Sequence, residues 1–395
     1  MVRVLSIDVF RGVTMLLMIW VNDFWTLQNI PKWLKHAAAG EDYLGFSDLI
    51  FPWFLFALGM AIPFSFESRT NSGETPLSTF KHIFFRTIAL LAMGLFHMNM
   101  EMYNHDTSII SKPVFVIICT LAFFIIWNRY PKTQSGRFPI SRVLPALGVA
   151  ILLVMFLIYK GKSYDGSEIS FSIHWWGILG LIGWCYLITA SVYFIFKGSI
   201  SIMAIAFFVS ISLNAIASMG ITYNIFSWQS GNWIPGNGGL QALTFGGIIT
   251  SLLLKSYGNG KNTKKLYSII LALGSLALVT GLLLRSQFII NKINGTPTWV
   301  LVSLSSSLFL FVLLHWLTDI KGIVNWYRPI KTAGTATLVC YLVPYLFYSF
   351  ITILGIKAPV FLSAGLIGLS KSMLYSFIII GISWSITRIK IQLKI

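Results

Sequence analysis

Long apolar runs alternate with short polar connectors along the whole chain. An α-helix needs about 20 apolar residues to cross the hydrocarbon core of a bilayer. The pattern therefore predicts about twelve spans, near residues 5–24, 46–66, 83–103, 113–128, 143–160, 174–197, 200–220, 238–257, 266–286, 298–318, 333–354 and 371–388. The run near 359–369 is too short to span alone and is expected to be re-entrant or to lie on the surface. We predict an all-α polytopic membrane bundle of about 10–12 transmembrane helices, forming one domain over residues 1–395.

Composition supports this class. Of the 395 residues, 56% are hydrophobic and only 10% are charged, whereas soluble domains carry about 25% charged residues. The net charge of +17 comes from basic residues in short clusters between apolar runs, which indicates membrane topology and argues against nucleic-acid binding. The cysteines lie inside apolar runs and the histidines show no metal-ligand spacing, so neither a disulfide framework nor a metal site is expected.

The distribution of basic residues predicts the orientation. With the N-terminus inside, twenty Lys and Arg residues fall on the inner side and nine on the outer side. Cytoplasmic loops collect Lys and Arg, so both termini are expected in the cytoplasm. The outer loops gather acidic residues such as Glu41 and Asp42.

The first span, "SIDVFRGVTMLLMIWVNDF", carries polar groups at both ends. An ionisable group within a span costs about 2.5–3.5 kcal/mol on insertion scales, so it is a functional candidate. Asp8 and Arg11 share one helix face and form either an intrahelical ion pair or a site where Arg11 meets an anion in a cavity. Asn22 and Asp23 either cap the outer end or face water there.

Two further residues follow in the chain. Asp48 stands in the first turn of the second span, where a carboxylate commonly caps a helix. His36 lies in the preceding connector, where a lone histidine is usually only solvated. Histidine is nevertheless the side chain best suited to proton transfer near neutral pH, so the catalytic alternative stays open.

These residues resemble the transmembrane acyltransferase family of heparan-α-glucosaminide N-acetyltransferase. The resemblance rests first on "SIDVFRGVTMLLMIWVN", "LKHAAAG" and "SDLIFPWFLFALGMAI". It continues through "RTIALLAMGLFHMN", "WWGILGLIGWCYLITA", "INKINGTPTWVL" and "PIKTAGTATLVCYLVPYL". It implies an enzyme that moves an acetyl group from cytoplasmic acetyl-CoA to an amino sugar, such as the glucosamine of heparan sulfate. A bacterial inner-membrane member with a periplasmic glycan acceptor is expected, and a homodimer is compatible with the family.

Carried over by position, the family's outer-loop asparagine and histidine fall on Asn22 and His36, and the histidine is the residue regarded as catalytic. The aspartate of its "DLVFPW" block falls on Asp48, and its "DxFRG" block supplies Asp8 and Arg11. This chain departs from the family at Ala336, where asparagine is expected, and at residues 178–183, which read "ILGLIG". The spans near 113–128 and 143–160 look additional to the lysosomal enzyme.

The predicted site has two parts. On the outer side, His36 acts as base or acetyl carrier, Asn22 donates to the oxyanion and Asp48 fixes the histidine tautomer. On the inner side, basic groups meet the CoA phosphates. The predicted CoA-binding residues are Asp8, Arg11, Arg86 and Lys255.

A transporter or flippase is the alternative function. It would move a small polar or lipid-linked substrate across the surrounding membrane lipids without covalent chemistry. The spans carry few charges in their deepest parts and show no internal repeat, and both features argue against transport.

Overall fold

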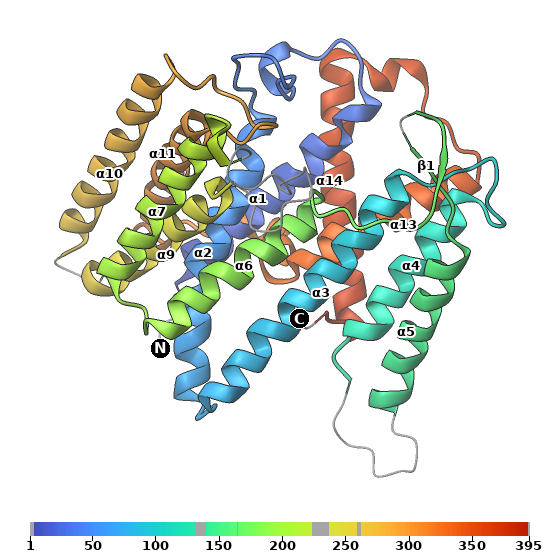
Figure 1. Ribbon diagram of the computed structural model, residues 1–395, viewed down its shortest axis with the longest axis horizontal. Coiled ribbons are helices and arrows are strands. Elements are labelled where there is room, and N and C mark those ends of the chain that lie inside the picture. Colours follow the sequence, from blue (N-terminus) through green and yellow to red (C-terminus); the bar gives the residue numbers. More distant parts are fainter. Residues whose placement is uncertain (1–3, 131–139, 164, 223–236, 259–261, 394–395) are drawn as a thin grey trace.

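The computed structural model describes residues 4–130, 140–163, 165–222, 237–258 and 262–393. Each predicted span overlaps a helix of 16 to 26 residues (Figure 1). These helices are α1 (Leu5–Asn22), α2 (Ser47–Asn71), α3 (Pro76–Glu101), α4 (Lys112–Trp127), α5 (Ile140–Ile158), α6 (Ile178–Ile195), α7 (Ile200–Ser218), α9 (Gly239–Tyr257), α10 (Thr263–Leu284), α11 (Pro297–His315), α13 (Thr337–Ile353) and α14 (Gly365–Arg388). Within the described residues, one small sheet is present: β1 (Gly161–Lys162) and β2 (Glu168–Ile169), of two residues each, pair antiparallel.

Length and apolar composition confirm the polytopic class. Within the described ranges, nine helices are long and apolar enough to cross a membrane. The number rises to ten if a bent pair, in which residues 325–335 meet α13 at an angle of 79°, counts as one broken span and not as a re-entrant loop. The bend falls at Ala336, between the short helix α12 (Lys331–Thr335) and α13. The protein is therefore an all-α, multi-pass membrane bundle.

The predicted helix ends need correction in two places. The expected connector 67–82 is mostly helical, because α2 continues to Asn71 and α3 begins at Pro76, where the hydroxyl of Thr75 accepts the amide of Ser78. The expected short segment 359–369 divides into a 3₁₀ turn, Val360–Ser363, and the start of α14. In both places the helix extends past its apolar run, because hydropathy reports the bilayer contact and not the helix end.

Helix α1 lies inside the bundle and packs on α2, α11, α12, α13 and α14. In Figure 1, α7, α9, α10 and α11 stand on one side of it, and α4 and α5 stand on the other. Small residues allow the closest helix contact. A Cβ added to Gly59 of α2 would lie 2.0 Å from the carbonyl oxygen of Thr244 on α9. This approach of two backbones is typical of membrane helix interfaces.

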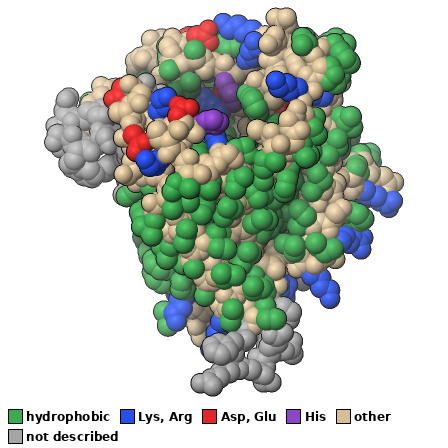
Figure 2. Space-filling model, turned by 90° about the vertical axis from the view of Figure 1, so that its right-hand side faces the viewer, with side chains coloured by type: hydrophobic (Ala, Val, Ile, Leu, Met, Phe, Trp, Pro, Cys, Tyr) green, Lys and Arg blue, Asp and Glu red, His purple; other side chains and the backbone are tan. Residues whose placement is uncertain are grey.

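The molecule has two polar faces, which we call the terminal face and the loop face. The terminal face contains the start of α1 and the helical turn Trp316–Ile320 that follows α11. There Asp319 accepts the amides of Leu5 and Ser6 at 3.0 and 2.9 Å, which ties these two segments together. The loop face carries residues 23–46 and 285–296, the connectors that follow α1 and α10. Figure 2 shows an apolar band between the two faces, with Lys and Arg at the lower end and both charge signs at the upper end.

Candidate functional site

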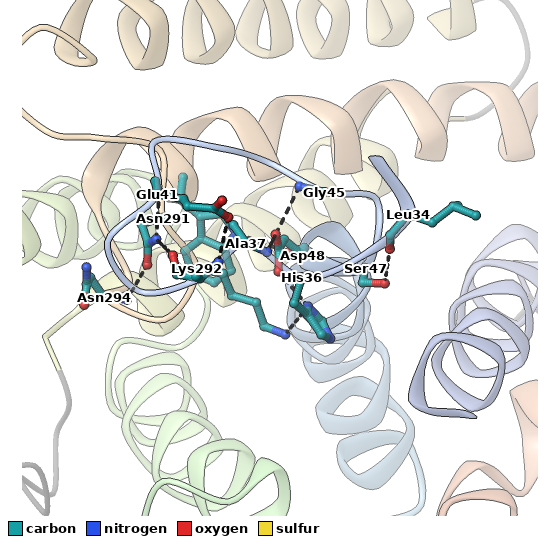
Figure 3. A network of polar contacts seen from close by, with 12 residues as sticks. Leu34, His36, Ala37, Glu41, Gly45, Ser47, Asp48, Asn291, Lys292 and Asn294 are labelled. Atoms are coloured by element: carbon teal, nitrogen blue, oxygen red, sulfur yellow. Dashed lines mark hydrogen bonds and ion pairs between the residues drawn. The ribbon is translucent and has the colours of Figure 1, made fainter. Parts of the chain in front are cut away.

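His36 and Asp48 meet on the loop face. His36 lies in the connector after α1, and its Nδ1 is 2.7 Å from Oδ1 of Asp48, in the first turn of α2 (Figure 3). The imidazole side chain is 45% exposed, whereas the carboxylate side chain is only 1% exposed. A buried carboxylate that accepts Nδ1–H fixes the tautomer and leaves Nε2 with a free lone pair.

The carboxylate of Asp48 is also held by the backbone. Its Oδ2 accepts the amides of Ala37 and Gly45, each at 3.1 Å. Residue 45 has to be glycine here, because a Cβ would lie 1.7 Å from the carbonyl oxygen of Lys35. The connector therefore folds tightly onto the start of α2, and three donors satisfy the buried charge.

Lys292 brings a positive charge to the same imidazole. It lies in the connector between α10 and α11, and its Nζ is 3.2 Å from Nδ1 of His36. Burial lowers the pKa of Lys292, and the nearby charge of Asp48 partly opposes this shift. An imidazole nitrogen that donates its hydrogen to Asp48 cannot also accept one from the ammonium group. We assign the hydrogen to the shorter contact with Asp48, which leaves Lys292 as a neighbouring cation.

The segment that carries Lys292 also holds the His36 connector in place. The buried side-chain amide of Asn291 donates to the carbonyl oxygens of Ala38 and Glu41, at 2.7 and 3.0 Å (Figure 3). Beside it, Nε of Arg285 lies 3.0 Å from Oδ2 of Asp42. Sequence reasoning counted Lys292 only as an outer charge and missed Asn291. The block "INKINGTPTWVL" was the available signal, because four polar residues stand there shortly before a span: Asn291, Lys292, Asn294 and Thr296.

Asn22 lies outside this cluster. Its side chain is exposed at the end of α1, and the described residues give it no contact with His36 or Asp48. It lies one helical turn beyond Met18 on the same face of α1.

The neighbouring Asp23 is buried and has a structural role that the sequence did not reveal. Its carboxylate accepts hydrogen bonds from Tyr348 and Ser372, and Lys371 lies 3.2 Å from it. These contacts tie the loop-face end of α1 to α13 and α14.

A cavity of about 920 Å³ lies along α1 and contains most of the residues predicted to bind CoA. Asp8, Arg11 and Arg86 line it, together with apolar side chains such as Met18 and Phe54. Its lining on α1 extends from Ile7 to Met18, about 16 Å at 1.5 Å per residue. Charged groups thus stand near the terminal face, and an apolar stretch leads toward the loop face. His36 and Asp48 are not part of the lining.

The charged side chains of the cavity have defined neighbours. Nη1 of Arg11 is 3.8 Å from Oδ1 of Asp8, and its Nη2 donates to the hydroxyl of Thr337 at 3.2 Å, beside the helix break. The guanidinium of Arg86 stacks 4.7 Å from the ring centre of Tyr186. Arg11 therefore forms the intrahelical contact with Asp8 and also lines the cavity.

Lys255, the fourth residue predicted to bind CoA, lies apart from this lining. Its ammonium forms an ion pair with Glu67 of α2, and it stands 5.2 Å from the ring centre of Phe64, which does line the cavity. Within the described ranges, no group of three or more His, Cys, Asp or Glu side chains is placed to hold a metal ion.

The fold and these two sites define a multi-pass membrane protein with a histidine–carboxylate pair on one face and a long cavity that contains arginines. The chain belongs to the family described as domain of unknown function DUF5009, whose sequence profile matches residues 3–241. It is also similar to heparan-alpha-glucosaminide N-acetyltransferase, with 32% identity to the protein of Homo sapiens and 31% to that of Mus musculus over 101 residues. The matched stretch covers 25% of this chain and only 14% of either relative.

Proposed function

We propose that the protein is a membrane-bound acetyltransferase of a bacterial inner membrane. It would take an acetyl group from acetyl-CoA at the terminal face and deliver it to an amino sugar or glycan at the loop face. The observation that carries this proposal is the His36–Asp48 pair on the face opposite the arginines of the cavity. The partial similarity to N-acetyltransferases supports the same reaction class.

The cavity suits a ligand with one anionic end and a thin arm. Arg11 and Arg86 would bind phosphates, for which guanidinium groups are good partners. The apolar stretch up to Met18 and Phe54 would surround the pantetheine arm. Asp48 stands six residues before Phe54 on α2, so about 9 Å along the helix separates the cavity from the histidine site.

At the loop face, the free Nε2 of His36 would take a proton from the attacking sugar amine. The amine nitrogen bonds to the thioester carbonyl carbon, the carbon–sulfur bond breaks, and the CoA thiolate receives the proton. The carbonyl oxygen becomes negative during this attack, and the ammonium of Lys292, 3.2 Å from Nδ1 of His36, would stabilise it. Asn22 would assist from the end of α1.

Two routes are compatible with this geometry. In the first, His36 acts only as a base while the donor and the acceptor are bound together. In the second, Nε2 of His36 first carries the acetyl group and then passes it to the amine.

Orientation is part of the proposal, with the terminal face in the cytoplasm. The native Cys119, Cys185 and Cys340 are buried, so a single introduced cysteine can report sidedness. An impermeant maleimide should label Lys357→Cys in intact cells but Lys264→Cys only after permeabilisation, because both positions are exposed and lie on opposite faces. The reverse labelling would contradict both the orientation and the direction of transfer.

The decisive experiment is acetyl transfer from labelled acetyl-CoA to glucosamine in proteoliposomes. His36→Ala should lower the rate at least about 10²-fold, roughly 3 kcal/mol of barrier, because the base is lost. Lys35→Ala changes the neighbouring exposed residue and should keep the wild-type rate. Near-wild-type turnover by His36→Ala, or movement of the sugar across the membrane without acetylation, would contradict the proposed function.

A further inference from the structure

A second cavity, of about 450 Å³, lies among α7, α9, α10 and α11. Helix α7 packs mainly on α9, and α10 packs mainly on α11, so the cavity is a groove between α7 and α10. Among the described residues that line it, the polar side chains are the hydroxyls of Ser212, Thr250 and Thr280. The remainder of the lining is apolar, which excludes a charged ligand from its interior.

The groove covers one half of the bilayer. Its lining on α11 extends from Pro297 to Leu308, about 16 Å along the helix, or roughly half of a 30 Å hydrocarbon core. Pro297 begins α11 and Leu284 ends α10, and both positions are at the loop face. The groove therefore extends from the loop face to about the middle of the membrane.

The groove also faces the lipid. The apolar windows of α7 and α10 are only 17% and 28% buried within the protein. Phe208 of α7 and Leu276 of α10 form part of its lining and are 65% and 63% exposed. In a membrane, the medium beside such a surface is hydrocarbon, so the groove suits a lipid chain.

One connector, residues 285–296, joins the loop-face end of the groove to the histidine site. It connects Leu284 and Pro297, which both line the groove, and the same segment places Lys292 3.2 Å from Nδ1 of His36. On the other wall, the side-chain amide of Asn214 on α7 donates to the carbonyl oxygen of Gly295 at 2.7 Å. A molecule with its chain in the groove therefore has its polar head beside this segment.

We propose that the groove holds the hydrocarbon chain of a lipid-linked amino-sugar acceptor, whose head group reaches His36. This inference rests on the proposed function and names its acceptor class: an amphipathic glycolipid of the loop-face leaflet. A soluble sugar would leave the groove unused, whereas a lipid-linked sugar gains binding energy from each buried methylene.

The first test measures chain binding without any reaction. Ser212→Trp fills the groove from an exposed lining position, and Ile205→Trp is the matched control, because Ile205 is 60% exposed on the same helix but outside the lining. The probe is phosphatidylglycerol with a diazirine in its acyl chain, in nanodiscs. We expect cross-links to α7 and α10 in the wild type and in Ile205→Trp, and at least about a tenfold loss in Ser212→Trp, since each lost methylene weakens binding roughly fourfold. Equal cross-linking in Ser212→Trp, or cross-links that join two copies of the chain, would overturn the proposal.

The second test compares acceptors in the acetylation assay. The wild type should acetylate glucosaminyl diacylglycerol at least about tenfold faster than free glucosamine at equal concentration, a difference of about 1.4 kcal/mol. Ser212→Trp should lose this preference, and Ile205→Trp should keep it. Equal use of both acceptors by the wild type would overturn the inference. Failure to acetylate either acceptor would contradict the proposed function instead, while the cross-linking result would still decide whether a lipid chain occupies the groove.

Discussion

The histidine site on the loop face and the cavity along α1 place their polar groups by different means. Around His36, two connectors hold each other through backbone amides and carbonyls, and the partner residues are up to 256 positions apart in sequence. Along the cavity, Asp8 and Arg11 are three residues apart on one helix, and the neighbouring side chains are mostly apolar. The hydrogen bonds around His36 fix the positions of individual atoms. Along the cavity, the helix only places charge near the end of the cavity at the terminal face. Substitutions should therefore abolish the reaction at the first site and weaken affinity at the second.

The strongest test of this difference is Asp48→Asn. The two backbone amides on Oδ2 would keep the asparagine oxygen, so its NH₂ group would face Nδ1 of His36. The hydrogen of the imidazole would then move to Nε2, which would no longer act as a base. We expect a loss of activity of about 10³–10⁴-fold, as in other histidine–carboxylate sites with this change.

The measurement is the acetyl-transfer rate, together with thermal stability to show that the variant is folded. Glu41→Gln is the matched control on the same connector, because that carboxylate contacts Lys32 and Ala38 but not His36. Asp48→Asn activity within a few fold of wild type would reduce Asp48 to a helix cap.

Lys292 should give the next largest effect. Lys292→Met removes the cation beside Nδ1 of His36 and should lower the rate about 10²-fold, the scale of a lost oxyanion donor. Burial lowers the pKa of Lys292, so its ammonium loses its charge at a pH below the usual value for lysine. The wild-type rate should therefore decline as the pH rises through that lowered pKa.

Lys292→Arg separates charge from shape, because a guanidinium stays protonated over the whole range. Its pH profile should lack the alkaline decline, and the exposed Lys32→Met should keep the decline. An alkaline decline that persists in Lys292→Arg would assign this pH dependence to another group.

The sequence predicted the spans well and the loop-face site only in part, for a physical reason. Apolar runs report the bilayer directly, so each predicted span has its helix. The His36–Asp48 contact joins two neighbouring blocks of one recognisable pattern, and the structure brings them together. The contact of Lys292 with His36 depends on tertiary packing, and no local feature separates this lysine from the other basic residues of the predicted outer loops.

The same argument explains Lys255 and the helix ends. Lys255 belongs to a basic cluster, which favoured a phosphate contact. Its partner Glu67 lies in a part of α2 that the hydropathy pattern had assigned to a connector, so the ion pair was not foreseen. Polar residues at the ends of spans are therefore where sequence patterns discriminate least between a structural and a functional role.

At the cavity, Arg11→Gln should weaken CoA binding about tenfold or more, because hydrogen bonds to charged groups contribute roughly 1.5–3 kcal/mol. The protein should remain folded, because the Arg11 side chain is 32% exposed and its contact with Asp8 is 3.8 Å long, and partly exposed ion pairs contribute about 0–1 kcal/mol. Equilibrium binding of radiolabelled CoA to the purified protein measures the change. Unchanged affinity would leave Arg11 as the structural partner of Asp8.

The smallest expected effect belongs to Lys255→Gln, and it tests whether the cavity lining or the basic cluster defines the CoA site. Lys255 is partly exposed, pairs with Glu67 and does not line the cavity. Partly exposed ion pairs contribute about 0–1 kcal/mol, so stability should change little and CoA affinity should stay at the wild-type value. The binding assay used for Arg11→Gln, together with the melting temperature, measures both quantities. A loss of CoA affinity as large as that of Arg11→Gln would extend the nucleotide site beyond the cavity to the end of α9.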